Sequence, residues 1–409
     1  MDPIKRLKLA CYSANSTMSV VGNLPPILFL TFRTLYGISY TLLGTLVLIN
    51  FVTQLVIDLI FSFFSHRFNI PKTVKVIPVI AALGLLFYAV WPYLFPEHVF
   101  PGLVIGTIIF CSSAGLGEVL ISPVIAAIPA DDPDREMSKL HSVFAWGVVV
   151  VTVLSTLFLA VFGGENWQIL VFLSLLLPIA SAFLFAGAEI PPMETPERAS
   201  GAFHLLKNKG LWVCVIAIFL GGASECTMAQ WSSGYLEQAL GIPKVMGDLF
   251  GVAMFSLMLG LGRTLYSNIG KNIGKILTLG AIGAAICYFV AAVSSIPVIG
   301  LLACAFTGFC TSMLWPGNLV VASARFPQGG VFIYAMMAAG GDLGASVGPQ
   351  LIGIITDAVI ANPSAAAFAS SLSLAPEQLG MKLGMLVGML FPLAAIPLYR
   401  YIWKTQKAQ

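Results

Sequence analysis

Charged residues are scarce in this chain of 409 residues. Asp, Glu, Lys and Arg make up 10% of it, whereas a soluble domain carries about 25%. Hydrophobic residues make up 58%, and the mean hydropathy is +0.92. This composition excludes an ordinary water-soluble enzyme. Lipid cannot hydrogen-bond to the backbone, so a chain that lives in lipid must form helices or a closed barrel.

Motifs for catalysis, metals and nucleotides are missing too. The seven cysteines form no C-x-x-C pair and, with the four histidines, match no metal-ligand spacing, so we interpret them as packing residues. No phosphate-binding G-x-x-x-x-G-K-[ST] sequence occurs. The net charge of +3 comes from basic residues spread over short loops. We therefore expect no enzymatic activity, no cofactor or metal, and no nucleic-acid partner.

Long apolar stretches are what the chain has in abundance. A membrane-spanning helix needs about 20 mostly apolar residues, and twelve stretches meet that length. None shows the alternation with period two that marks barrel strands. The sequence therefore predicts an all-α membrane protein with twelve transmembrane helices. The predicted spans are 11–32, 39–64, 73–94, 100–128, 139–163, 167–188, 210–235, 245–269, 273–293, 297–324, 329–360 and 378–403.

The basic residues predict the orientation of these spans. With the N-terminus inside, only Arg33, Lys244 and Lys382 of the 21 Lys and Arg residues fall in outside segments. Inside loops of membrane proteins carry such an excess of Lys and Arg. We therefore expect a multi-pass protein of the cell (inner) membrane with both termini in the cytoplasm.

A polar stretch in the middle divides the chain. Residues 189–209 separate six spans from six spans, which predicts two pseudo-symmetric halves, 1–188 and 210–409, joined by a cytoplasmic linker. Internal matches favour a duplication: Tyr36-Gly37-Ile38 and Leu240-Gly241-Ile242 lie 204 residues apart, each between two spans. Parallel halves of this kind are one of the architectures of secondary transporters.

With this layout the chain resembles the major facilitator superfamily. That family carries a basic, glycine-rich signature around an Asp between spans 2 and 3, and here Asp58 and Arg67 remain of it while the glycines are absent. The second half keeps Gly262 and Arg263. The resemblance implies that Asp58 is a gate latch, with Arg67 or Arg135 as its partner, and that Arg263 acts as their counterpart. The sequence does not choose between the two partners.

Span 4 refines the resemblance. Gly117-Glu118-Val119-Leu120-Ile121-Ser122-Pro123 resembles the fucose-permease-like branch, in which a membrane-embedded Glu precedes a Pro. Trp315-Pro316-Gly317 in span 10 fits that branch as well, and we count Trp315 among the substrate-binding candidates.

Ionisable side chains inside apolar spans are costly, so each is a functional hypothesis. Glu118, Glu225 and Asp342 are the candidates for proton coupling. A carboxyl group in a low-dielectric site can take a proton on one side of the membrane and release it on the other. Glu118 is the first candidate; its alternative is a structural carboxylate bonded to hydroxyl groups of neighbouring spans. For Asp342 a substrate or proton role and a structural bond stand equal.

Substrate-binding candidates surround these acids. Span 7 carries Glu225, Gln230 and Trp231, and in the resembled family this span breaks near the substrate. A carboxylate, an amide and an indole suit a sugar, although Trp231 could instead anchor the span at the outer interface. Asn23 lies beside Pro25-Pro26, where we expect span 1 to be interrupted; its alternative is a helix-to-helix bond. Asp342 is the remaining substrate-binding candidate.

These features predict a transporter that works by alternating access. The expected cargo is a small polar solute, a sugar or sugar-like compound, carried by symport with protons through a monomer in the lipid bilayer. The alternative is a proton-linked exporter of amphipathic compounds or metabolites.

Overall fold

The structure is a computed structural model that describes residues 2–64, 67–128, 133–191, 205–269, 272–326 and 330–406. Those residues form helices and no strand. Among them, eleven helical segments are long and apolar enough to cross a membrane. The remaining predicted span falls on helix α5, where the apolar helical stretch Trp146–Phe162 is shorter. The predicted fold class, an all-α membrane protein, is confirmed.

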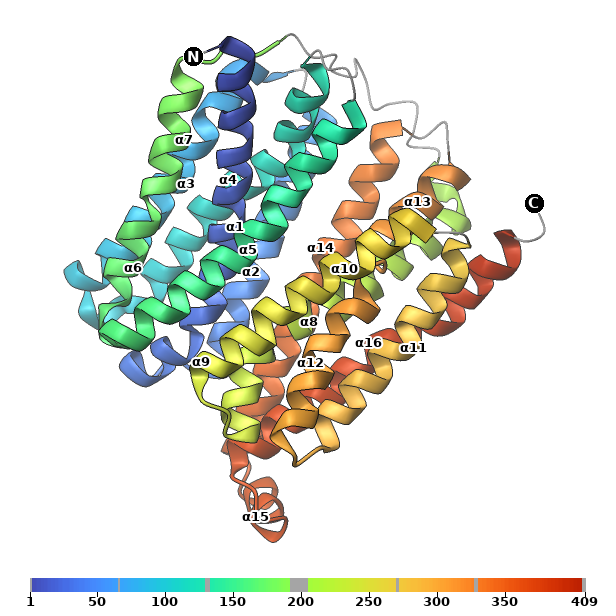
Figure 1. Ribbon diagram of the computed structural model, residues 1–409. Helices are drawn as coiled ribbons and strands as arrows, with labels where there is room; N and C mark the ends of the chain where they lie inside the picture. The colour runs from blue at the N-terminus through green and yellow to red at the C-terminus, as the bar shows by residue number, and fades with distance from the viewer. Residues whose placement is uncertain are drawn as a thin grey trace. The chain divides into compact units, whose positions relative to one another are not determined.

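The helices follow the predicted spans in order (Figure 1). Those before the linker are α1 (Pro3–Tyr36), α2 (Tyr40–Phe64), α3 (Ile70–Leu94), α4 (Val99–Ala127), α5 (Pro133–Phe162), α6 (Trp167–Ser174) and α7 (Leu176–Ala186). Those after it are α8 (Lys209–Leu240), α9 (Lys244–Gly247), the π-helix η5 (Asp248–Ala253), α10 (Met254–Ile269), α11 (Ile273–Val293), α12 (Pro297–Thr311), α13 (Pro316–Arg325), α14 (Gly330–Ala361), α15 (Pro363–Ser371) and α16 (Pro376–Gln406).

Matching glycines end the first helix and the helix that follows the linker. Gly37 follows α1 with φ 65°, and Gly241 follows α8 with φ 66°. Glycine adopts this left-handed conformation without the steric penalty of a Cβ atom, and it commonly closes helices. The internal sequence match 204 residues apart therefore corresponds to the same backbone turn in both places, which supports the predicted duplication.

Two predicted interruptions do not occur, and one that was not predicted does. α1 stays helical through Pro25 and Pro26, and α8 runs unbroken for 32 residues. Each proline removes one N–H donor, and in lipid the remaining backbone groups of α1 must still be bonded within the helix. Span 10 is interrupted, because α12 ends at Thr311 and α13 begins at Pro316 after a turn of four residues.

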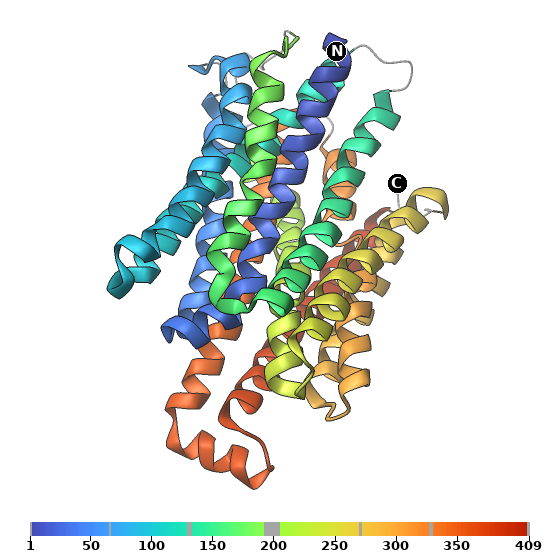
Figure 2. The same cartoon turned by 60° about the vertical axis from the view of Figure 1, so that its left-hand side comes forward.

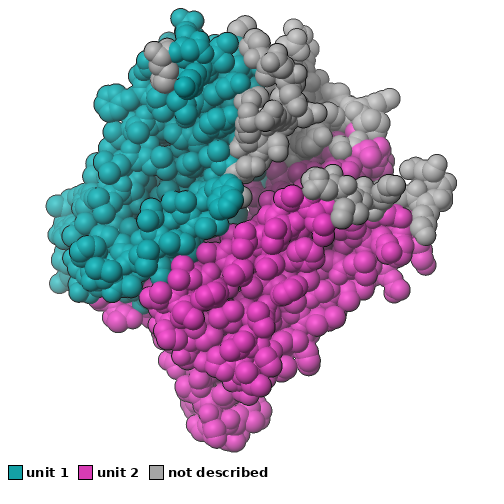
Figure 3. Space-filling model, in the orientation of Figure 1, with its two compact units in different colours: residues 1–31, 49–200 teal, residues 32–48, 201–409 magenta. Residues whose placement is uncertain are grey.

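The chain divides into two compact units (Figure 3). Unit 1 comprises Met1–Thr31 and Ile49–Ser200, and unit 2 comprises Phe32–Leu48 and Gly201–Gln409. The end of α1 and the start of α2 thus belong to the compact unit that contains α8 to α16. The predicted halves 1–188 and 210–409, with the linker 189–209, stay a prediction, and most of that linker lies outside the described residues.

A continuous apolar core holds unit 1 together. Its members come from α1, the end of α2, α3, α4, α5 and the end of α7, and they include Leu7, Phe61, Val74, Val124 and Phe185, each at most 4% exposed. The helices bury these faces against one another and leave other apolar residues exposed, among them Leu154 and Val161 at 60% and 73%. Exposed apolar faces suit a lipid environment rather than water.

Unit 2 is built around the contact between α8 and α14. A Cβ atom added at Gly344 would lie 2.0 Å from the carbonyl oxygen of Phe219, so only glycine permits this approach. Small residues bring membrane helices together in this way, and the glycine-rich sequence of α14 serves packing. α15 lies beyond the ends of α14 and α16 (Figures 1 and 2), fixed by a small cluster of Val359, Ala369 and Leu379.

Candidate functional site

The broken span 10 leaves one backbone carbonyl without its helical partner. Pro316 has no N–H, and in a continuous helix that N–H would bond the carbonyl of Ser312, four residues earlier. Arg263 of α10 replaces it: its Nε donates to the Ser312 carbonyl oxygen at 3.1 Å. The Trp315-Pro316-Gly317 sequence therefore determines where the helix breaks. The Nε–H of Arg263 replaces the missing backbone donor.

The same arginine forms an ion pair with an acid of α8. Arg263 Nη2 lies 3.3 Å from Glu225 Oε1. The arginine side chain is 44% exposed, whereas that of Glu225 is 13% exposed. The other carboxylate oxygen, Oε2, is buried and accepts no hydrogen bond from the residues that the structure describes. A pair joined through a single oxygen leaves bonding capacity on both partners.

Trp315 lies against two glycines. A Cβ atom added at Gly341 would stand 2.6 Å from its ring, and one added at Gly222 would stand 3.0 Å from it. These glycines belong to α14 and α8, so the indole contacts both helices at the point where span 10 breaks. Asp342 follows Gly341 directly and is 4% exposed.

One cysteine links the ionisable groups of this region. Cys226 interacts electrostatically with Glu225, Asp342 and Arg263. The structure thus brings together Glu225, Cys226, Arg263, Trp315 and Asp342, from α8, α10, the α12–α13 turn and α14; we name this set the charged cluster. Four of its members were singled out from the sequence, although Arg263 was expected at a gate. It combines two acids, a cation, an aromatic ring and a broken helix.

Two residues predicted beside Glu225 lie further along α8. Trp231 is 1% exposed, and its indole nitrogen donates to the carbonyl of Pro349 at 2.9 Å. A Trp in an interfacial belt would be exposed, so the alternative of an outer anchor does not describe this side chain. Gln230 is half-buried.

The candidates of unit 1 lie on α1 and α4. Glu118 is exposed although α4 continues for nine residues beyond it. Asn23 is half-buried, and its Nδ2 donates to the carbonyl of Ser19 within α1 at 2.9 Å. This bond lies within one helix, so it is not the helix-to-helix bond of the alternative, and the substrate contact of Asn23 stays a prediction.

The predicted latch residues are only partly described. Asp58 is buried at 3% exposure. Arg67 is exposed and its guanidinium lies 5.4 Å from the ring centre of Phe64. The side chain of Arg135 lies outside the described residues, so the choice between the two partners of Asp58 stays open.

Sequence reasoning missed a set of contacts at the start of α2. The carboxylate of Asp357 in α14 accepts hydrogen bonds from the backbone N–H groups of Tyr40 (3.2 Å) and Thr41 (2.6 Å). Arg33 lies 3.9 Å from the ring centre of Tyr40 and 3.7 Å from Glu377. These contacts hold the segment 32–48 within unit 2. Ser39 caps the same helix start, since its hydroxyl accepts from the backbone N–H of Leu42 at 3.3 Å, so no local feature of the sequence pointed to Asp357.

A second missed feature is a buried ion pair beside the π-helix. Asp248 is fully buried, and its carboxylate meets Lys244 Nζ at 3.2 Å and the hydroxyl of Ser233. π-Helical turns often occur at functional positions. Here, however, the charges of Lys244 and Asp248 neutralise each other.

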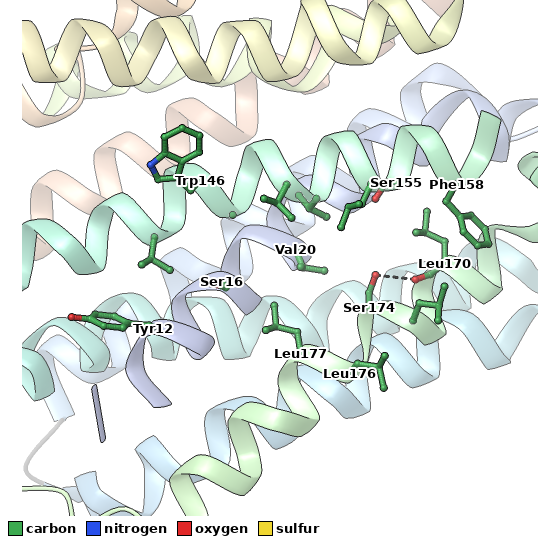
Figure 4. A pocket seen from close by; sticks show the side chains of 16 residues that line it. Tyr12, Ser16, Val20, Trp146, Ser155, Phe158, Leu170, Ser174, Leu176 and Leu177 are labelled. Carbon is green, nitrogen blue, oxygen red and sulfur yellow. Dashed lines mark hydrogen bonds between the residues drawn. The ribbon is translucent and has the colours of Figure 1, made fainter. Parts of the chain in front are cut away.

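An apolar cavity of about 1120 Å³ opens in unit 1 between α1, α5 and the α6–α7 pair (Figure 4). Hydroxyl groups are few on its wall: those of Tyr12, Ser16, Ser155 and Ser174. Ser174 donates its hydroxyl to Leu170 within its own helix at 2.9 Å. Residues of α5, such as Trp146, Leu154 and Phe158, provide half of the lining.

No group of three or more His, Cys, Asp or Glu residues that could hold a metal ion occurs in the described part of the chain.

Comparisons with known proteins were made by sequence and by fold. A model of the Major Facilitator Superfamily matches residues 10–349. No curated protein sequence matches the chain.

Solved structures share the fold. A bacterial homolog of the human lysosomal transporter Spinster, inward-facing and unoccupied, superposes with a TM-score of 0.79 at 11% identity, covering 99% of this chain and 98% of that one. The xylose transporter XylE from E. coli gives 0.72 at 16% identity and 96% coverage of both chains. The nucleoside transporter NupG gives 0.70 at 12% identity, covering 98% of this chain and 100% of that one. Such low identities establish the fold alone.

Proposed function

Because this chain belongs to the major facilitator superfamily, and is thus a membrane transporter rather than an enzyme, we propose that it is a secondary active transporter of a small polar solute. The proposed cargo is a sugar or sugar-like compound, moved by alternating access in symport with protons. We place the transporter in the inner cell membrane as a monomer with both termini in the cytoplasm. The fucose-permease-like branch remains the proposed place within the superfamily.

The charged cluster carries this proposal. A sugar offers paired hydroxyl groups, which carboxylates and guanidinium groups bond well, and apolar C–H faces, which pack on an indole. Glu225, Arg263 and Trp315 supply these three partners around a broken helix, and broken helices line the binding sites of transporters. A xylose–proton symporter has the same fold, which makes D-xylose the first compound to try.

The remaining predicted residues keep supporting roles in the proposal. We propose Glu118 and Asp342 as proton carriers in addition to Glu225, and Asn23, Gln230 and Trp231 as further substrate-binding residues. Asp58, Arg67 and Arg135 form the gate. Glu118 lies at the protein surface far along the apolar helix α4, and a proton carrier must reach water from such a position.

The test is uptake of labelled neutral sugars, D-xylose first, into proteoliposomes with and without an inward-acid pH gradient. Accumulation that follows the gradient, and that Glu118→Gln abolishes while counterflow exchange survives, is the expected result. Glu165→Gln is the matched control, since it removes an exposed carboxylate within the 3₁₀ turn before α6. Equal accumulation by wild type and Glu118→Gln would remove Glu118 from coupling.

The unit 1 cavity favours a second function, the proton-linked export of amphipathic compounds. Its wall of aliphatic and aromatic side chains suits the apolar part of such a molecule. Everted vesicles that accumulate an amphipathic fluorescent dye under a pH gradient would support it, provided Val150→Trp in the cavity lowers the rate. Val298→Trp on α12, an apolar residue 64% exposed, is the matched control. Unchanged dye transport by Val150→Trp would exclude the cavity as the site.

A further inference from the structure

We propose that the cargo carries a carboxylate: the solute is a hydroxylated monocarboxylic acid of sugar size, whose carboxylate replaces Glu225 on Arg263 while Glu225 takes up the coupled proton. This inference rests on the proposed function and names the substrate class of its site.

The arginine is anchored independently of the acid it would release. Its Nε is bonded to the carbonyl of Ser312 at 3.1 Å, and only Nη2 reaches Glu225. When Glu225 leaves, the bond to Ser312 still holds the guanidinium in place. A preorganised cation of this kind binds an incoming anion without first being ordered.

Arg263 is the more accessible partner of the ion pair. Its side chain is 44% exposed, whereas that of Glu225 is 13% exposed, so an incoming solute can contact the guanidinium more readily than the carboxylate. A hydroxyl can accept from the guanidinium, but a carboxylate adds a negative charge and a second acceptor oxygen in the same plane, so it binds more strongly. The partly exposed cation therefore favours an anion over a neutral solute.

A free carboxylate can bind this arginine better than Glu225 does. Glu225 contacts it through Oε1 alone, at 3.3 Å, which is longer than the about 2.7–2.9 Å of a strong charge-assisted bond. A solute that is not tied to α8 can place both oxygens in the guanidinium plane and form two parallel bonds. A carboxylate of the solute can therefore compete with Glu225 for Arg263.

Displacement gives a reason for proton uptake. Once its cation is taken, ionised Glu225 would remain in a largely buried site that also contains Asp342, and both interact with Cys226. An unpaired buried charge is unfavourable, and neutralisation relieves it. One proton from water then binds Glu225, so one anion and one proton enter together; release of both on the other side restores the ion pair.

The test compares solutes that differ only by the carboxylate, in proteoliposomes containing the full chain. The pairs are D-glucuronate and D-glucose, D-gluconate and D-glucitol, and D-xylonate and D-xylose. The expected result is exchange of the acid of at least one pair at a half-saturation concentration about tenfold or more below that of its neutral partner. Tenfold corresponds to about 1.4 kcal/mol of binding free energy.

Two variants assign the roles. Arg263→Gln should raise the half-saturation concentration for the acid at least tenfold, whereas Glu225→Gln should keep or tighten exchange and lose accumulation driven by the pH gradient. Lys275→Gln, which removes an exposed cation of α11, is the matched control and should behave as wild type. If Arg263→Gln does not fold, Arg263→Lys keeps the charge without the planar fork, and it should weaken exchange severalfold.

The outcomes separate the two proposals. Preference for the neutral members, or acid exchange that survives loss of Arg263, overturns the substrate class and leaves the proposed function in place. If no member of any pair is transported, the proposed function fails and the inference fails with it.

Discussion

The carboxylate of Asp357 bonds the backbone N–H of Thr41 at 2.6 Å, across 316 residues of sequence. Through this bond and the one to Tyr40, a side chain of α14 caps α2. The N-terminus of a helix carries unbonded N–H groups and a partial positive charge, so a carboxylate stabilises it.

Replacing Asp357 should loosen the start of α2. Asp357→Ala removes both acceptors, and a lost helix cap costs about 0.5–2 kcal/mol. We expect faster hydrogen–deuterium exchange of the amides in 40–45, measured by mass spectrometry in detergent. Glu377→Gln, which breaks only the partly exposed pair with Arg33 at 3.7 Å, should change little, because such pairs contribute about 0–1 kcal/mol. Unchanged exchange in Asp357→Ala would contradict the capping role.

The packing of Trp315 can be tested at Gly222. A Cβ there would lie 2.5 Å from the backbone oxygen of Gly341, so Gly222→Ala forces the helices apart. Overpacking of this kind costs about 1–3 kcal/mol, and we expect a lower thermal midpoint in detergent. Gly260→Ala in α10 is the control: nothing lies within 4 Å of its added Cβ, and alanine favours the helix. Equal midpoints for the two variants would show that the contact is not tight.

The buried hydroxyl of Tyr399 bonds the helix that follows the break in span 10. Tyr399 of α16 donates to the carbonyl of Ala217 and accepts from Asn318 Nδ2, both at 2.9 Å, and it is fully buried. Tyr399→Phe removes the hydroxyl that bonds both groups, at a cost of about 1–3 kcal/mol. Tyr401→Phe, at a position 51% exposed, should stay within about 0.5 kcal/mol. Thermal melting monitored by size-exclusion chromatography compares them, and similar loss in both would contradict this account.

Cys226 offers a direct probe of the charged cluster. It is half-buried and interacts with two carboxylates and one guanidinium. With both acids ionised the surroundings carry a net negative charge, so a cationic thiosulfonate reagent should modify it faster than an anionic one of similar size. In a variant that keeps Cys226 as its only cysteine, bound solute should slow this modification severalfold. A modification rate that depends neither on the charge of the reagent nor on bound solute would show that the Cys226 thiol lies outside the site.

The fold was largely predictable because lipid imposes it. Apolar runs of the required length can only be helices in a bilayer, and the paired turns at Gly37 and Gly241 could be read from a local match. The acids Glu225 and Asp342 were also identifiable, since a charge in an apolar span is rare and costly.

Pairings between distant residues could not be predicted. Nothing local in the sequence indicates that Arg263 bonds Ser312 and Glu225 rather than a gate residue, because that depends on how α8, α10 and α12 pack. The same holds for Asp357 and Thr41. The break in span 10 itself could have been predicted, because Pro316 has no N–H to bond the carbonyl of Ser312.

The segment 32–48 also decides what happens if the polypeptide is cut. A break between residues 200 and 201 would give two fragments, yet the first would still contribute 32–48 to the unit formed by the second. The fragments would therefore share a folded body, as in split-protein complementation. Coexpressed, they should copurify through an affinity tag on either one, whereas the second fragment alone would lack the residues that Asp357 binds.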